Sequence, residues 1–254
     1  MRGPIIRSAL EVLNPASGSR GIDAGCGIGS HTLLLARAVG QTGHVYGVDL
    51  SSELLDIAKR RAAASGLTKQ VTFEAGDINH LRFDDHTFDW LWSVDCAGFI
   101  AAQPVRLVKE LARVVRPQGT VAILVWSSQQ LLPGHPLLEA RLNTTSAGIA
   151  PFVPGMEPQS HPLCMLGWLR QAGLVEPKAE TFVGTVHAPL TEEVRRALLS
   201  LLDMRWGNPQ SELTREDWTE YRRLSDPDSP DFILDRDDYY GFFTYSMFHG
   251  RAPR

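Results

Sequence analysis

The chain has 254 residues, the size of one large domain, and its 43% hydrophobic and 21% charged residues are ordinary for a globular protein. A net charge of −4 gives no general attraction for phosphate backbones or acidic lipid, so neither nucleic acid nor membrane is expected as a partner. The sequence shows no run of about 18 apolar residues, no signal-peptide pattern and only three widely spaced cysteines. We therefore expect a cytoplasmic protein with reduced thiols and no metal site.

Strand-like and helix-like patterns alternate along most of the chain. Short apolar stretches predict buried strands, and amphipathic stretches predict helices. The predicted strands are 20–24, 44–50, 71–77, 88–95, 120–127, 179–187 and 239–250. The predicted helices are 5–13, 29–39, 51–66, 103–115, 163–174 and 190–225. The repeated strand–helix order predicts an α/β fold with a doubly wound, mostly parallel seven-stranded sheet.

Two segments interrupt this order and predict insertions. Residues 128–162 contain six prolines, and residues 188–238 are polar, helical and then rich in turns. From 191 to 238 the chain has seven arginines and thirteen acidic residues, which is typical of a solvated surface and disfavours a nucleic-acid substrate. The expected organisation is a first core half at 1–127, a first cap insertion at 128–162, a core helix and strand at 163–187, a second, acidic cap insertion at 188–238, and a last core strand at 239–254.

The most informative motif is GIDAGCGIGS at 21–30, followed by VYGVDLSSELL from residue 45. It predicts a buried strand, a glycine loop that opens a helix, and a second strand that ends in an acid. This arrangement holds an adenosine-containing cofactor at the carboxyl ends of a parallel sheet.

The charge near the loop favours one cofactor. The dinucleotide fingerprint needs its third glycine where Ser30 stands, and Asp23 lies two residues before Gly25. A carboxylate at that place would repel a diphosphate but would attract an ammonium group. S-adenosylmethionine has no phosphate and carries an α-ammonium and a sulfonium, so the spacing favours it over NAD.

Four segments together resemble a known family. They are DAGCGIG at 23–29, VYGVDLS at 45–51, the stretch 71–93 that begins VTFEAGD, and ELARVVRPQGTVAILVW at 110–126. With these segments the chain resembles class I S-adenosylmethionine-dependent methyltransferases, near the small-molecule group that includes menaquinone-biosynthesis methyltransferases. The resemblance implies a Rossmann-like methyltransferase fold, S-adenosylmethionine as cofactor and 1–127 as the cofactor-binding half.

The resemblance also implies a role for residues of the loop and of the second strand. The backbone of Gly25, Cys26, Gly27 and Gly29 would pass close to the methionine and ribose, and Asp23 would lie near the ammonium. Asp49 would accept hydrogen bonds from both ribose hydroxyls, because a carboxylate offers two acceptor oxygens. The plainer alternatives are a tight turn for the glycines and a helix cap for Asp49.

Further positions follow the later strands. By resemblance, Leu50 would pack on the adenine, Asp77 would accept from the adenine amino group, Ile78 would cover the ring, and Ser93 would line the methionine side. Asp77 could instead only cap a turn with Asn79.

Candidates for catalysis lie beyond the fourth strand. Asp95 stands at a strand's carboxyl end, where ligands gather in open α/β sheets, and His135 and His161 are possible general bases. The alternative roles are a cap of the segment 96–100 for Asp95 and turn or surface positions for the two histidines.

The sequence thus predicts methyl transfer to a small aromatic or apolar molecule by in-line displacement, with the insertions forming a lid. The atom methylated and the oligomeric state stay open. The alternatives are a protein or RNA methyltransferase, a non-catalytic S-adenosylmethionine-binding regulator and an NAD-dependent oxidoreductase.

Overall fold

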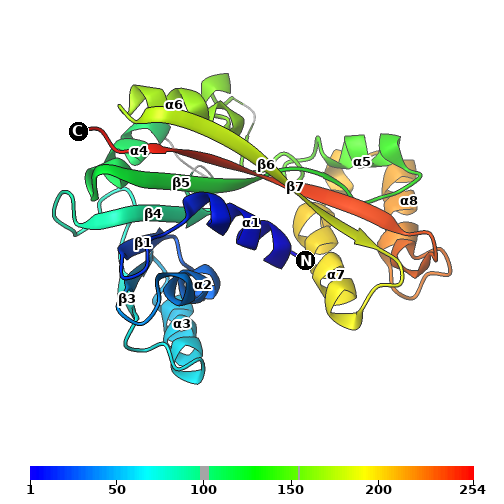
Figure 1. Ribbon diagram of the computed structural model, residues 1–254. Coiled ribbons are helices and arrows are strands. Elements are labelled where there is room, and N and C mark those ends of the chain that lie inside the picture. The colour runs from blue at the N-terminus through cyan, green and yellow to red at the C-terminus, as the bar shows by residue number, and fades with distance from the viewer. Residues whose placement is uncertain (98–102, 154) are drawn as a thin grey trace. The chain divides into compact units, whose positions relative to one another are not determined.

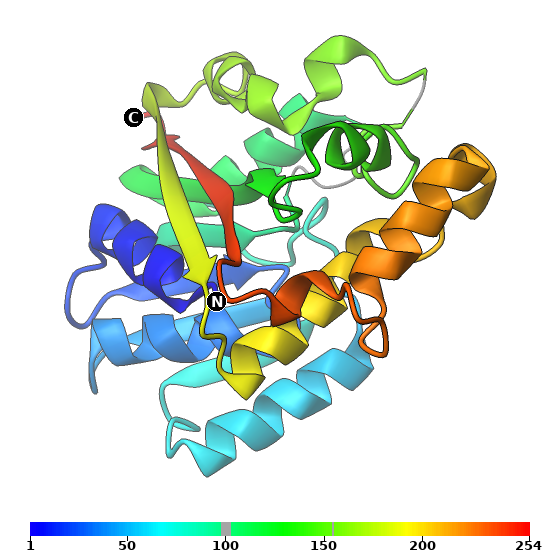
Figure 2. The same ribbon diagram turned by 90° about the vertical axis from the view of Figure 1, so that its right-hand side faces the viewer.

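A computed structural model describes residues 1–97, 103–153 and 155–254, and its strands form one seven-stranded sheet in the order β3-β2-β1-β4-β5-β7-β6 (Figure 1). The strands are β1 (Arg20–Ala24), β2 (His44–Asp49), β3 (Val71–Ala75), β4 (Phe88–Val94), β5 (Val115–Gln130), β6 (Val175–His187) and β7 (Tyr240–Arg251). Strands β1 to β5 pair in parallel, and Figure 2 shows β6 and β7 side by side with opposite directions. The predicted doubly wound, mostly parallel sheet is confirmed.

Eight helices occur in the described part of the chain. They are α1 (Gly3–Leu13), α2 (Ser30–Val39), α3 (Ser52–Ala64), α4 (Pro104–Arg113), α5 (Pro136–Leu142), α6 (Met165–Gln171), α7 (Glu192–Trp206) and α8 (Arg215–Ser225). Short 3-10 turns lie at 158–160, 162–164, 210–212 and 233–235. None of these helices is long and apolar enough to cross a membrane.

The chain divides into two compact units. The core unit comprises 5–126, 157–182 and 245–254, and the helical unit comprises 1–4, 127–156 and 183–244. Three of the boundaries fall within β5, β6 and β7, one falls within α1, and one lies between residues 156 and 157. The predicted role of 128–162 and 188–238 as caps stays a prediction, and residue 154 of the first segment lies outside the described residues.

In the core unit, alternate residues of β1 face opposite sides of the sheet. Ile22 belongs to an apolar cluster with Leu91 of β4 and with buried residues of α4 and α6. The next residue, Asp23, contacts Thr32 of α2 instead. Helices α2 and α3 pack against β1, β2 and β3. This part of the sheet is therefore covered on both faces, which explains why successive residues of β4, such as Trp90, Leu91 and Trp92, are all buried.

Helix α3 lies within the predicted range 51–66, and Ser51 is its N-cap. The Ser51 side chain accepts a hydrogen bond from the backbone N–H of Leu54 at 3.3 Å, which satisfies one free donor of the first turn. After the last turn, Gly66 takes a left-handed φ of 69°.

The structure differs from the sequence prediction at the start of β5. Pro117-Gln118-Gly119, expected as a turn before the strand, lies inside β5. Phe88 pairs with Val115 but Trp90 pairs with Thr120, so the register shifts between these pairs. Gln118 has a left-handed φ of 67°, which lets the extra residues bulge out without ending the strand.

In the helical unit, the predicted helical stretch 190–225 is two helices. Helix α7 ends at Trp206, and α8 begins after Thr214, whose side chain accepts from the Asp217 N–H. The Tyr221 hydroxyl of α8 donates to the Leu202 carbonyl of α7 at 3.1 Å. The two helices thus form a buried contact between their apolar faces.

We expect Gly29→Ala to destabilise the core unit more than Gly66→Ala does. Both glycines have left-handed φ angles, so each substitution adds strain of about 1–2 kcal/mol. A Cβ at Gly29 would also lie 2.9 Å from the Ala58 Cβ and 3.0 Å from the Phe73 ring, whereas nothing lies within 4 Å at Gly66. Urea unfolding of both variants should show an additional loss of about 1–3 kcal/mol at Gly29. Equal losses would contradict the close packing.

Candidate functional site

The glycine loop joins β1 to α2 at the carboxyl end of β1. Gly25, Gly27 and Gly29 all have left-handed φ angles, of 81°, 51° and 73°. The backbone N–H groups of Gly25 and Cys26 both donate to the Val48 carbonyl, at 2.8 and 3.0 Å. The loop is therefore fastened to the end of β2 in a conformation that residues with a Cβ adopt only under strain.

Asp49 makes the second connection between the loop and β2. Its Oδ2 accepts a hydrogen bond from the Gly27 N–H at 2.8 Å, and its Oδ1 accepts from the Ser51 N–H at 3.0 Å. A carboxylate oxygen can accept two hydrogen bonds, so each oxygen keeps capacity for one more donor. Asp49 is half-buried, and the neighbouring Leu50 is 75% exposed. Asp49 thus contacts Ser51, the N-cap residue of α3, and it also holds Gly27 of the loop.

Asp23 is a buried carboxyl beside the loop. Its Oδ2 accepts from the Thr32 hydroxyl at 2.6 Å, while its Oδ1 is buried without a hydrogen-bond partner. Burial raises the pKa of Asp23 from 3.8 to about 7, and the Thr32 hydrogen bonds oppose that shift. A buried acceptor without a donor is unfavourable, so Oδ1 fits a water or an ammonium group as partner.

The three loop glycines differ in how much space a side chain would have at each position. A Cβ at Gly25 would meet the Cys96 side chain at 2.2 Å, and one at Gly29 would meet α3 and β3. At Gly27 a Cβ would meet nothing within 4 Å. Gly25 and Gly29 are thus needed for packing, and Gly27 borders open space, as a position beside a ligand should. Cys26 is buried and its thiol pKa is raised by that burial, which does not suit a nucleophile.

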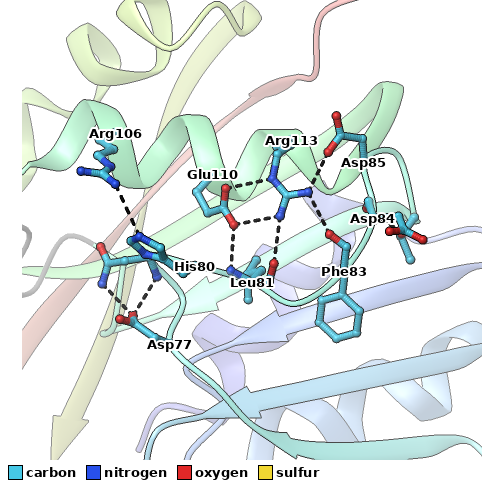
Figure 3. A network of polar contacts seen from close by, with 11 residues as sticks. Asp77, His80, Leu81, Phe83, Asp84, Asp85, Arg106, Glu110 and Arg113 are labelled. Carbon is cyan, nitrogen blue, oxygen red and sulfur yellow. Dashed lines mark hydrogen bonds and ion pairs between the residues drawn. The ribbon is translucent and has the colours of Figure 1, made fainter.

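Asp77 and Ile78 follow β3 and begin an irregular segment. Oδ1 of Asp77 accepts from both the backbone and the side-chain N–H of Asn79, each at 2.8 Å (Figure 3). These two bonds lower the pKa of Asp77. The turn with Asn79 is therefore present, and Oδ2 can still accept from a further donor. Ile78 is buried against the core.

Ser93 is fully buried at the end of β4. Its hydroxyl donates to the Ala24 carbonyl at 2.8 Å and accepts from the Ala97 N–H at 3.2 Å. Ser93 thus ties the end of β1 to the segment after β4. Its place on the methionine side stays a prediction.

The Asp95 carboxylate cross-links three strands. Oδ1 accepts from the Trp126 N–H of β5 at 3.0 Å, and Oδ2 accepts from the Tyr245 hydroxyl of β7 at 2.5 Å. Its own N–H donates to the Leu124 carbonyl, and its φ is 51°. The alternative of a cap for 96–100 falls partly outside the described residues. Both oxygens accept hydrogen bonds from other strands, and no local pattern in the sequence indicates these partners.

The two candidate histidines lie in different units. His135, in the helical unit, contacts Oε1 of Glu220 through its Nδ1 at 2.9 Å. His161, in the core unit, accepts from the Leu163 N–H through its Nδ1 at 3.2 Å. The Glu220 carboxylate therefore orients the His135 ring, whereas the His161 ring accepts a hydrogen bond within a local turn. Among the described residues, no group of three His, Cys, Asp or Glu side chains could hold a metal ion.

Sequence reasoning missed the partners that fix these acids. Thr32, which binds Asp23, lies nine residues along the chain on the first turn of α2, and the Gly27–Asp49 bond spans 22 residues. A polar residue on the inner face of the helix after a glycine loop is a signal that could have indicated Thr32.

Part of the chain is similar to known methyltransferases. Residues 22–119 match the family model described as a methyltransferase domain. The chain is 34% identical over 113 residues to the methyltransferase GfsG of Streptomyces halstedii, covering 44% of this chain and 40% of that protein. It is 32% identical over 126 residues to a demethylmenaquinone methyltransferase of Bacillus cytotoxicus, covering 50% and 52%. The chain thus spans about half the length of these curated relatives.

The fold also resembles solved structures. The geranyl diphosphate C-methyltransferase of Streptomyces coelicolor superposes with a TM-score of 0.56 at 17% identity, over 98% of this chain and 77% of that one. At this identity the likeness shows the fold alone. The fold prediction and the predicted methyltransferase domain are confirmed, whereas the predicted role of each site residue stays a prediction.

The pKa of Asp23 predicts a pH-dependent stability of the cofactor-free protein. A carboxyl whose pKa rises on folding favours the folded state below pH 4, and that contribution is lost as the pH rises toward 7. Relative to Asp23→Asn, the wild type should lose up to about 4 kcal/mol of unfolding free energy between pH 4 and pH 8. Denaturant unfolding across this range measures the difference.

The matched control is Asp56→Asn, which changes an exposed carboxylate of α3 that pairs with Lys59. Its difference from the wild type should stay nearly constant across the same range. A constant difference for Asp23→Asn as well would contradict a raised pKa at Asp23.

Proposed function

We propose that this chain transfers a methyl group from S-adenosylmethionine to a small aromatic or apolar molecule. Its residues 22–119 form a class I, S-adenosylmethionine-dependent methyltransferase domain. The observation that carries the proposal is the Gly27–Asp49 hydrogen bond. It places an acidic acceptor pair beside a glycine loop at the carboxyl ends of two adjacent parallel strands. Cofactors bind at this edge of an open α/β sheet.

The loop and its two acids suit the polar groups of S-adenosylmethionine. The free acceptor capacity of Asp49 matches two ribose hydroxyls, and Gly27 has open space beside its Cα. The unpartnered Oδ1 of Asp23 matches the ammonium group, directly or through water. The negative charge of a deprotonated Asp23 would then be compensated by a cation.

The segment after β3 supplies the adenine end of the proposed site. Oδ2 of Asp77 would accept from the adenine amino group, while its Oδ1 keeps the turn with Asn79. The exposed Leu50 offers apolar surface for one face of the ring, and Ile78, which is buried against the core, would present only its outer edge to the other.

Methyl transfer makes small demands on the protein. When bound, S-adenosylmethionine supplies a methyl group on a sulfonium leaving group, so the protein needs only to bind, orient and exclude water. A general base is required only where the acceptor must lose its proton early. Of the three candidates, His135 with Glu220 behind it has the arrangement of a base held by an orienting carboxylate. Asp95 is better suited to hold strands together than to accept a proton.

The acceptor class rests on the charge and on the relatives' names. The acidic stretch 191–238 disfavours nucleic acid. One relative is named for demethylmenaquinone and one structural neighbour for geranyl diphosphate, both small molecules. The lid function of 128–162 and 188–238 belongs to the same proposal.

Calorimetry with S-adenosylhomocysteine and NADH, followed by a metabolite screen with a labelled methyl donor, tests the proposed function. We expect binding of S-adenosylhomocysteine only, and label in at least one small molecule. Binding of NADH alone would overturn the proposal. Binding without any transfer would favour a non-catalytic regulator.

We expect Asp49→Ala to weaken S-adenosylhomocysteine binding by about 1–3 kcal/mol, because the ribose loses a charged acceptor. The Gly27 N–H loses its partner too, so thermal unfolding should be measured in parallel. Asp49→Asn keeps one acceptor oxygen and should bind with intermediate affinity. Asp56→Ala, an exposed acid on α3, serves as control and should leave the affinity unchanged. Wild-type affinity in Asp49→Ala would show that Asp49 does not hold the ribose.

A further inference from the structure

The connection from β3 to β4 is a twelve-residue segment without a helix, residues 76–87. Irregular backbone has no ladder of its own, so its N–H and C=O groups need other partners. Asp77 is the second residue of this segment, so the same partners also determine the position of the Asp77 carboxylate.

Two residues of α4 supply these partners, as Figure 3 shows. Glu110 Oε1 accepts from the Leu81 N–H at 2.7 Å. Arg113 donates through Nη2 to the Leu81 carbonyl at 2.9 Å, and through Nη1 to the Phe83 carbonyl at 2.8 Å and to Asp85 at 2.7 Å. Both backbone groups of Leu81 are thus satisfied by one pair of side chains.

Glu110 and Arg113 also hold each other. Arg113 Nε donates to Glu110 Oε2 at 2.9 Å, and Nη2 donates to Oε1 at 2.8 Å, which is the two-pronged geometry of a strong guanidinium–carboxylate pair. The side chains are 18% and 32% exposed, and the Arg113 hydrogen bond lowers the pKa of Glu110. The geometry of the pair is therefore held by its own two hydrogen bonds as well as by its bonds to the segment.

The fixed point at Leu81 lies four residues from Asp77. Between them the His80 N–H donates to the Asp77 carbonyl at 3.0 Å, which closes a turn. The side chains of Ile78 and Leu81 both belong to the apolar cluster that includes Leu107 and Leu111 of α4. Residues 77–81 thus form one compact turn, attached to α4 at its far end by Glu110 and Arg113.

We propose that Glu110 and Arg113 are positioning residues that hold the 77–81 turn, and with it Asp77, in register with the adenine amino group of the cofactor. The inference rests on the proposed function, and it assigns the adenine selectivity of the site to a pair that touches neither cofactor nor acceptor. Without the pair, Asp77 keeps its turn with Asn79 but loses its fixed place relative to the sheet.

The test is the ratio of two dissociation constants, measured by calorimetry for S-adenosylhomocysteine and for S-inosylhomocysteine, which carries an oxo group in place of the amino group. The wild type should prefer S-adenosylhomocysteine by about tenfold or more, because the oxo group faces an acceptor. Glu110→Ala and Arg113→Lys should weaken S-adenosylhomocysteine binding by about three- to tenfold and bring the ratio close to 1. Glu110→Gln keeps an acceptor for Leu81 and should retain part of the preference.

Arg116→Ala is the matched control, because Arg116 also pairs with a carboxylate, Asp89, but contacts no part of the turn. Its ratio should equal that of the wild type. A loss of stability without a change in the ratio would mean that the pair is only structural, and would overturn the inference. If Glu110→Ala does not fold, Arg113→Lys and Glu110→Gln decide by the same criterion.

Two outcomes separate this inference from the proposed function. A wild type that binds neither compound overturns the proposed function itself. A wild type that binds both equally, or variants that keep the full preference, overturn only the positioning role of Glu110 and Arg113.

Discussion

The hydrogen bond from the Gly27 N–H to the Asp49 carboxylate is the interaction on which the site depends. It joins the tip of the glycine loop to the end of β2, while the Gly25 and Cys26 N–H groups bind the Val48 carbonyl just before it. A loop of left-handed glycines has little preference for one conformation, so such bonds are needed to select one. The same carboxylate supports the loop and, in the proposed function, would accept hydrogen bonds from the ribose hydroxyls.

Three positions that follow strands at this edge of the sheet are held by side-chain hydrogen bonds to a neighbouring helix or strand. Asp49 holds the loop after β1, Glu110 and Arg113 hold the segment after β3, and Asp95 takes hydrogen bonds from β5 and β7 after β4. Binding loops can therefore be irregular and yet fixed, as a site that aligns two reactants requires.

The sequence predicted local structure well, because it depends on short-range patterns. The bounds of β1 agree with the structure, and Asp23 and Asp49 lie in β1 and at the end of β2 as predicted, whereas their role toward a cofactor stays a prediction. The break between α7 and α8 was missed, because 190–225 was predicted as one helical stretch although Gly207-Asn208-Pro209 is a helix stop.

Long-range partners were not predictable in the same way. The Tyr245 hydroxyl reaches Asp95 across 150 residues, and nothing in either local sequence indicates the bond. The same holds for Arg113 with the Phe83 carbonyl, because such a pair depends on how the helix packs rather than on periodicity. Asp95 stays a catalytic candidate, and its two oxygens accept hydrogen bonds from Trp126 and Tyr245 of the sheet.

The most direct test is a crystal structure of the chain with S-adenosylhomocysteine. Both ribose hydroxyls should lie within about 2.6–3.2 Å of the Asp49 carboxylate oxygens, with the Gly27–Asp49 hydrogen bond intact and the adenine amino group at Asp77. A cofactor bound at another edge of the sheet, or a ribose that does not contact Asp49, would contradict the central role of this carboxylate.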